Sequence, residues 1–178
     1  ERDMRLLRGK FCSMVFQNPM TALNPSLPVG AQIAEAVKVH RPRMSRKDVE
    51  HRVAELMDLV GIDHPTERKK QYPHHLSGGM RQRSVMAIAL AAEPRLLFAD
   101  EPTTALDVTI QAQILDLLKE MQARLHTAMV FITHDLGVAA RVADRVAVMY
   151  AGRIAEIGTA EEVFHDPRHP YTWGLMRA

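Results

Sequence analysis

Cysteine is nearly absent from this chain, and its scarcity limits both the fold and the compartment. The 178 residues contain a single cysteine, Cys12, so no disulfide can form within the chain. A lone thiol is typical of proteins in reducing compartments, which favours a cytosolic location. We expect Cys12 to be a small buried residue in a strand, the usual place of an unpaired cysteine.

Long apolar runs and a strong charge of either sign are also missing. The longest apolar run, Val85–Ala92, is far shorter than the ~18 residues that a membrane-spanning helix needs. No signal-peptide pattern is visible, so we expect no secretion signal. The formal net charge is only +2, with acidic and basic residues interspersed, which gives no indication of nucleic acid or an anionic membrane as a partner. A role at a membrane would therefore act through membrane-embedded partners.

What the chain does contain is an ordinary globular composition in which strand and helix patterns alternate. The hydrophobic fraction of 47% and the charged fraction of 25% suit a soluble domain. Apolar runs predict four strands: Phe11–Phe16, Leu96–Ala99, Ala128–Ile132 and Val146–Met149. The middle two are continuously apolar, which is typical of parallel strands covered on both faces. The alternation of strands and helices predicts an α/β fold around a parallel sheet.

Apolar residues at helical spacing predict the helices between these strands. Ser45 and Asp107 are the expected N-caps of two of them, and Gly61 is expected to end the helix that Ser45 begins. No convincing strand lies between Gln17 and Ser77, so this stretch is expected to form a helical insertion beside the sheet. The predicted helices cover Val29–His40, the segment between Ser45 and Gly61, the segment from Ser77 to about Ala92, and the segment from Asp107 to Leu125.

Polar residues directly follow three of the predicted strands. Gln17 follows the first, Asp100 and Glu101 follow the second, and Thr133 and His134 follow the third. Ligands of open parallel sheets bind at the carboxyl ends of the strands. We therefore expect these side chains to share one site.

The acidic pair has chemistry that suits phosphoryl transfer. A buried strand would deliver Asp100 to help hold Mg²⁺ and Glu101 to orient or deprotonate an attacking water. A strand that ends in a solvated acidic turn at Pro102 would give the same residues, so the pair alone leaves both interpretations open.

A serine- and glycine-rich string, Leu76–Arg83, begins the third predicted helix. Ser77 can cap this helix, and Gly78 and Gly79 let backbone N–H groups approach an anion at its positive end. An ordinary helix start would also use serine and glycine. His134 has the chemistry to contact a terminal phosphate or hold an attacking water, although a lone histidine is more often structural.

Taken together, these strings resemble the motifs of the ABC ATPase family. In family order, Gln17 resembles the Q-loop glutamine, Leu76–Gln82 the signature, Leu96–Glu101 the Walker B strand with its glutamate, Thr104–Asp107 the D-loop, and His134 the switch histidine. The resemblance implies a partial P-loop NTPase (ABC ATPase) fold, with a helical subdomain inserted after the Q-loop. The stretch Gln17–Pro25, Met80 in the signature and the string His169–Thr172 are similar to peptide and nickel importer ATPases.

The resemblance also implies a division of the chain into four segments. Residues 1–28 would hold a core strand and the Q-loop, and residues 29–76 the helical subdomain. Residues 77–158 would form the ATPase core with the signature, Walker B, D-loop and switch histidine. Residues 159–178 would begin a C-terminal extension of the peptide-importer type.

Roles carried over from the family involve ATP and Mg²⁺. Glu101 would be the general base, Asp100 and Gln17 would serve Mg²⁺, and His134 would contact the γ-phosphate. Ser77, Gly78 and Gly79 would act across a dimer interface, on ATP held by a second ATPase subunit. Asp107 would link the two ATP sites.

The partners implied by the resemblance place the protein at the cytoplasmic face of a membrane. It would dock on two membrane permease subunits, pair with a second ATPase subunit, and serve an extracytoplasmic substrate-binding protein indirectly. Nucleic acid is not among the implied partners. The cargo would be a dipeptide or oligopeptide, with nickel left open.

One family element does not occur in these 178 residues. The string G-x-x-x-x-G-K-S/T is absent; Gly9-Lys10 is followed by Phe11 and has Met4 at the position of the first glycine. This string forms the backbone cradle and supplies the lysine that neutralise the β- and γ-phosphates, so we expect the chain alone to hydrolyse ATP poorly.

Two alternatives stay open. The chain would also suit a degenerate or truncated module that supplies only its signature face to a partner ATPase. A DNA-maintenance ABC ATPase is disfavoured, because those proteins carry long coiled-coil or zinc-bearing insertions and the segment between Gln17 and Ser77 is short.

Overall fold

The computed structural model describes residues 7–104 and 106–177. The chain divides into two compact units, the first ending at Ile132 and the second beginning at Thr133. No helix within the described ranges is long and apolar enough to cross a membrane.

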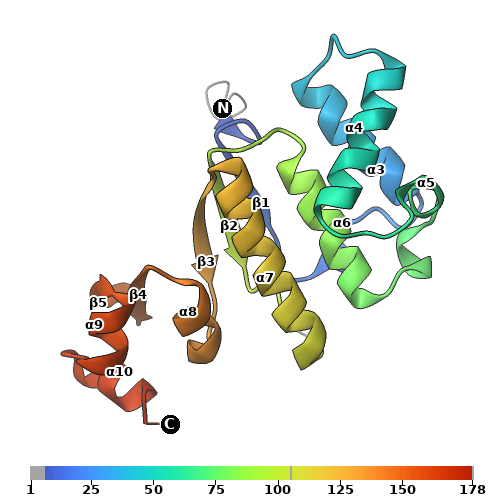
Figure 1. Cartoon of the computed structure of the whole chain (residues 1–178). Coiled ribbons are helices and arrows are strands. Elements are labelled where there is room, and N and C mark those ends of the chain that lie inside the picture. Colours follow the sequence, from blue (N-terminus) through green and yellow to red (C-terminus); the bar gives the residue numbers. More distant parts are fainter. Residues whose placement is uncertain (1–6, 105, 178) are drawn as a thin grey trace. The chain divides into compact units, whose positions relative to one another are not determined.

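The first unit is built on a parallel three-stranded sheet (Figure 1). Its strands are β1 (Cys12–Val15), β2 (Leu96–Asp100) and β3 (Ala128–Ile132), with β2 in the centre. In the register, Val15 pairs with Ala99, and Ala99 pairs with Phe131. Three of the four predicted strands are thus confirmed as neighbours. Because they are parallel, the residues that follow them leave the sheet at the same edge.

Helices cover one face of this sheet, whereas the other face exposes apolar side chains. Val15, Leu97 and Ala99 are buried, and Val15 and Leu97 belong to one apolar cluster with residues of α6 (Gly78–Leu90) and α7 (Val108–Leu125). On the opposite face, the side chains of Val130 and Ile132 are 41% and 45% exposed. The expectation that the middle two strands are covered on both faces is therefore wrong for β3.

The stretch after Gln17 is helical, as predicted, and contains no strand before Ser77. Ser45 caps the second long helix of this stretch, because its hydroxyl accepts a hydrogen bond from the Asp48 N–H at 3.2 Å. Gly61 follows the end of that helix with φ +69°, a conformation that favours glycine. The elements are α2 (Pro19–Ala22), α3 (Val29–His40), α4 (Arg46–Leu59), α5 (Pro65–Arg68) and the 3₁₀ turn η1 (Pro73–His75).

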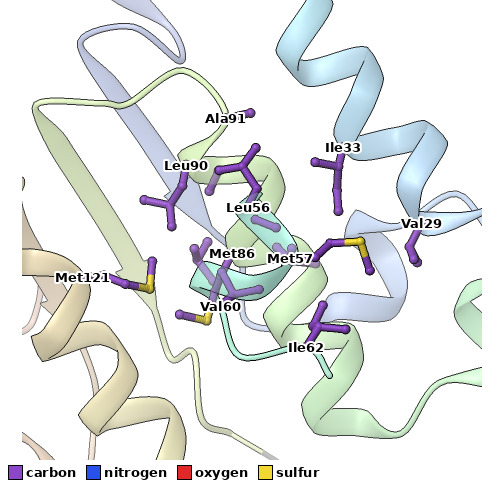
Figure 2. Packing of buried hydrophobic residues seen from close by; sticks show 14 of the residues in the cluster. Val29, Ile33, Leu56, Met57, Val60, Ile62, Met86, Leu90, Ala91 and Met121 are labelled. Atoms are coloured by element: carbon purple, nitrogen blue, oxygen red, sulfur yellow. The ribbon is translucent and has the colours of Figure 1, made fainter. Parts of the chain in front are cut away.

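Helix α6 packs between this helical insertion and the sheet and contacts both. Its Met86 and Leu90 are fully buried, and Figure 2 shows side chains of the neighbouring helices converging on them. The start of α6, at Ser77, is therefore held in place by packing along the whole helix. The converging side chains come from α3 (Val29 and Ile33), α4 (Leu56 and Met57) and α7 (Met121).

The second unit consists of a helix, a β-hairpin and two short helices. Strand β4 (Arg145–Tyr150) pairs antiparallel with β5 (Arg153–Thr159), and the loop between them is Ala151-Gly152. Both loop residues have positive φ, 48° and 76°, as a type I′ hairpin turn requires. The predicted fourth strand therefore exists, but its inclusion in a parallel sheet is wrong, and β5 was not predicted. The helices are α8 (Leu136–Val142), α9 (Ala160–His165) and α10 (Pro170–Leu175).

The single cysteine lies in β1, where a strand residue was expected. Cys12 is only partly buried, however, so the expectation of a fully buried thiol is wrong. Its side chain is on the face of the sheet that also carries Met14 and, through the register, Phe98 and Val130.

Candidate functional site

The ends of β1 and β2 bring two of the predicted site residues into contact. Gln17 follows the end of β1, and Glu101 directly follows β2. The Gln17 Nε2 group donates a hydrogen bond of 2.7 Å to Glu101 Oε2, across 84 positions of sequence. The structure therefore brings together the side chains that follow the first two strands, as their positions after parallel strands predict.

The backbone of Glu101 adopts an uncommon conformation that turns the chain away from the sheet. Its φ is +43°, in the left-handed region that non-glycine residues rarely occupy. Two backbone hydrogen bonds hold it there: the Glu101 N–H donates to the Ile132 carbonyl at 2.9 Å, and the Thr104 N–H donates to the Glu101 carbonyl at 3.1 Å. Such conformations cost roughly 1–3 kcal/mol and cluster at functional sites, where surrounding contacts maintain them.

Thr104, the first residue of the predicted D-loop, belongs to this arrangement through a contact with Glu101 that was not predicted. Its Oγ1 hydroxyl donates to Glu101 Oε2 at 2.8 Å, so the same carboxylate oxygen accepts from both Gln17 and Thr104. A hydroxyl residue three positions after an acid, across a turn containing Pro102, is the one signal in the sequence that points to it.

The hydrogen bond to Glu101 also sets the orientation of the Gln17 amide. Because the NH₂ group faces the carboxylate, the amide oxygen is directed away from Glu101. Amide and carboxylate oxygens are suitable ligands for Mg²⁺, and Asp100 ends the neighbouring strand β2.

Within the described residues, no group of three His, Cys, Asp or Glu side chains is placed to hold a metal ion. Mg²⁺ is usually held by one or two protein oxygens together with phosphate oxygens and water. By the chemistry of their oxygen atoms, Gln17 and Asp100 fit a magnesium ion that arrives with a phosphate ligand.

The serine- and glycine-rich string forms the beginning of α6, as predicted. The Ser77 hydroxyl caps the helix by accepting a hydrogen bond from the Met80 N–H at 3.3 Å. A Cβ atom on Gly79 would lie 2.8 Å from Ile110 Cγ2, so the packing of α6 against α7 excludes a side chain there. Among the described residues, a Cβ atom on Gly78 would meet only Leu106 Cδ2, at an ordinary 3.6 Å. Packing within this chain therefore explains Gly79 but not Gly78.

The remaining predicted residues occupy helix starts. Asp107 is the N-cap of α7, confirmed by the hydrogen bond that its carboxylate accepts from the Ile110 N–H at 2.9 Å. The predicted D-loop Thr104–Asp107 includes Ala105, which lies outside the described residues. His134 precedes Asp135, whose side chain caps α8. The link of Asp107 to a second site and the phosphate contact of His134 stay predictions.

Comparison with known proteins assigns the family. Residues 2–104, more than half of the chain, match the family model described as ABC transporter. The chain belongs to the ABC transporter family. This membership agrees with the order of the motifs and with the position of Gln17 and Glu101 at the ends of adjacent parallel strands.

Curated relatives of this ABC transporter chain carry peptide-transport names. It is 60% identical over 176 residues to the oligopeptide transport ATP-binding protein OppD of Bacillus subtilis, covering 99% of this chain and 49% of the relative. It is also 60% identical to the dipeptide transport ATP-binding protein DppD of the same organism, covering 99% of this chain and 52% of the relative. The chain thus spans about half the length of the curated relatives it matches.

Solved structures show the same fold. An ATP-binding cassette solved as a dimer in a post-hydrolysis state with ADP and Pi superimposes with a TM-score of 0.77 at 27% identity, covering 90% of this chain and 67% of that chain. The cbiO1 protein of Clostridium perfringens, part of the cbiONQ transporter complex, gives 0.78 at 30% identity, covering 95% and 68%. The chain therefore has an α/β fold of the ABC ATPase type and corresponds to about two-thirds of each of these chains.

Proposed function

We propose that this chain is part of the ATP-hydrolysing subunit of an ABC importer for dipeptides or oligopeptides. The observation that supports it most directly is the Glu101 carboxylate at the end of β2, oriented by hydrogen bonds from Gln17 and Thr104. The peptide-transport names of relatives at 60% identity support the cargo class.

In the proposed reaction, a water molecule attacks the γ-phosphorus of ATP, the bond from that phosphorus to the β–γ bridging oxygen breaks, and ADP and inorganic phosphate are released. Glu101 orients this water and accepts its proton, while the positive φ and the two side-chain donors keep the carboxylate in one orientation. Asp100 and the amide oxygen of Gln17 would hold Mg²⁺, which would supply positive charge that offsets the negative charge of the phosphate oxygens. His134 contacts the γ-phosphate.

The signature helix acts on ATP held by a second ATPase subunit. The backbone N–H groups of Gly78 and Gly79, which precede the Met80 N–H that Ser77 caps, and the positive end of the helix dipole favour a phosphate group. Gly78, which this chain's own packing does not require, allows close approach of that phosphate. The residues that contribute to this second contact are Ser77, Gly78, Gly79 and Asp107.

The proposed assembly is an ATPase pair on the cytoplasmic face of a membrane. Two permease subunits bind the pair, an extracytoplasmic substrate-binding protein delivers the peptide, and no nucleic acid takes part. Within the chain, residues 1–28 and 77–158 form the ATPase core, residues 29–76 the helical subdomain, and residues 159–178 the start of a C-terminal extension.

A second candidate function has its own support. The start of α6 that carries the signature string is intact and is capped by the Ser77 hydroxyl. In this alternative, the chain supplies only its signature face to the ATP site of a partner subunit.

ATP hydrolysis by the complete gene product, reconstituted with its permeases, tests the proposal. Glu101→Gln keeps the size of the side chain but removes its basicity, so hydrolysis should fall by roughly 10²–10⁴-fold while ATP binding is retained. The matched control is Glu120→Gln, which removes an exposed carboxylate that pairs with Arg124 on the surface of α7 and should leave the rate unchanged.

The outcomes separate the two candidates. Hydrolysis that survives Glu101→Gln contradicts the proposed role of Glu101. Hydrolysis that requires an added partner ATPase, and is lost on Ser77→Ala but not on Glu101→Gln, supports the signature-face alternative instead.

A further inference from the structure

Two side chains donate hydrogen bonds to the same oxygen of the Glu101 carboxylate, and they differ in burial and in their distance from Glu101 along the sequence. Gln17 reaches Oε2 from the exposed loop after β1, across 84 positions of sequence. Thr104 reaches the same oxygen from three positions away and is partly buried.

Thr104 is tied to Glu101 twice. Its backbone N–H donates to the Glu101 carbonyl at 3.1 Å and its hydroxyl donates to the Glu101 carboxylate at 2.8 Å. Threonine is β-branched, so its hydroxyl has few rotamers to choose from. The two hydrogen bonds close a short turn in which the positions of the hydroxyl and the carboxylate determine each other.

The donor from Gln17 has a second task in the proposed reaction, because the same amide would bind Mg²⁺ through its oxygen. A change in the position of Gln17 on nucleotide binding would weaken its hydrogen bond to Glu101. The Thr104 hydroxyl belongs to the same turn as Glu101 and moves with it, so its hydrogen bond does not depend on the Q-loop. A base whose carboxylate orientation is fixed before the reaction loses less rate to misalignment.

We propose that Thr104 is a positioning residue, which holds the Glu101 carboxylate in its working orientation independently of Gln17. This inference rests on the proposed function for its consequence in hydrolysis, but the hydrogen bond itself can be tested on the 178-residue chain without ATP. Three variants are compared. Thr104→Val removes the hydroxyl at nearly constant shape, Thr104→Ser keeps a hydroxyl, and Thr127→Val is the control.

The third variant, Thr127→Val, is the matched control. Thr127 is buried, and its hydroxyl, like that of Thr104, donates a hydrogen bond within the first unit, here to the backbone carbonyl of Pro94 at 2.9 Å. Thr127 lies before β3, at the opposite end of the sheet from Glu101, so its loss affects stability but not the carboxylate.

The first measurement is the NMR signal of the Gln17 side-chain NH₂ group in the nucleotide-free chain. This group donates to the oxygen that Thr104 also contacts. We expect Thr104→Val to shift and broaden the signal towards its position in Glu101→Gln, and Thr104→Ser and Thr127→Val to leave it near that of the unsubstituted chain.

The second measurement is steady-state ATP hydrolysis by the complete gene product. Thr104→Val should lower kcat roughly tenfold, a part of the ~10²–10⁴-fold that a positioned base contributes, and leave KM for ATP unchanged. Thr104→Ser should restore most of the rate, and Thr127→Val should keep it.

The outcomes decide the inference and the proposed function separately. An unchanged Gln17 signal in Thr104→Val overturns the inference. It is also overturned if Thr127→Val loses kcat as Thr104→Val does and both losses follow the fall in melting temperature, because the effect is then one of general stability. A complete gene product that hydrolyses no ATP contradicts the proposed function, and the NMR comparison then decides the hydrogen bond on its own.

Discussion

At the scale of single residues, the two glycines that begin the signature helix are glycines for different physical reasons. Gly79 faces Ile110 of α7, with room for a hydrogen atom but not for a methyl group. Gly78 has ordinary space for a Cβ atom. The resemblance to ABC ATPases treats the two alike, whereas the contacts assign Gly79 to helix packing and leave Gly78 for a ligand or a partner.

Alanine should therefore lower the folding stability at Gly79 but not at Gly78. Gly79→Ala places a methyl group 2.8 Å from Ile110 Cγ2, which sits next to the backbone and cannot move away as the end of a long side chain would. The overpacking cost of ~1–3 kcal/mol outweighs the ~1 kcal/mol gain in helix propensity, so urea denaturation should show a net loss of about 1 kcal/mol.

Gly78→Ala is the control for this experiment, and its stability should be unchanged or higher by up to about 1 kcal/mol. Ile110→Ala combined with Gly79→Ala should destabilise less than the sum of the single changes, because the clash disappears with Ile110. Equal losses for the two glycine variants would show that the Ile110 contact is not the cause.

At the scale of the elements, helix boundaries could be predicted because their signals are local. Ser45, Ser77 and Asp107 each cap the helix that follows them, and α3 begins and ends at the predicted residues, Val29 and His40. The partners of strands are not local, so the antiparallel pairing of β4 was missed. Strand β5 mixes polar and apolar residues on both faces and gives no alternation, although the turn at Ala151-Gly152 was a hairpin signal.

The candidate site at Glu101 could also be predicted only in part. Gln17 and Glu101 follow adjacent parallel strands, so the order of the strands is enough to bring them together. The hydroxyl of Thr104 reaches Glu101 because the chain turns at a positive φ; Pro102 indicates a turn after the acidic pair, but the left-handed conformation of Glu101 is not visible in the sequence.

The attachment of α10 to the hairpin gives a prediction at the same scale. The Glu156 carboxylate of β5 accepts hydrogen bonds from the N–H groups of Arg168 and His169, at 2.8 and 3.0 Å, just before α10 begins. The pKa of Glu156 lies below its ordinary value of about 4.5, because the nearby Thr172 hydroxyl and these two N–H groups favour the charged carboxylate. The Thr172 hydroxyl lies near the carboxylate but outside good hydrogen-bond geometry.

A lowered pKa means that this carboxylate stabilises the folded hairpin above about pH 4.5, and that the contribution is lost as the pH falls through the folded-state pKa. Glu156→Gln should accelerate hydrogen exchange at Arg168 and His169, relative to intrinsic rates, and remove the acid dependence of their protection. Glu161→Gln, at an exposed carboxylate on α9, serves as the control. Unchanged protection in Glu156→Gln would contradict this role of the carboxylate.

At the scale of the whole molecule, one face of the parallel sheet in the first unit exposes apolar side chains. The strand register places the side chains of this face together on the three strands. Two of them, the β-branched residues Val130 and Ile132, are more than 40% exposed. Contiguous exposed apolar surface on a sheet favours association between molecules. Met14 and Phe98 share this face in neighbouring positions.

Replacing the two exposed residues should therefore reduce self-association of the 178-residue chain. The double variant Val130→Thr and Ile132→Thr keeps β-branched side chains suited to a strand but adds hydroxyl groups to the surface. In sedimentation velocity at micromolar concentration, the unsubstituted chain should form oligomers and the double variant should shift towards monomer. Val39→Thr, at a residue 68% exposed on α3, removes apolar surface elsewhere and should leave the distribution unchanged. A dilute unsubstituted chain that stays monomeric and melts cooperatively would show that the open face does not drive association, whereas equal shifts in all variants would assign association to general hydrophobicity.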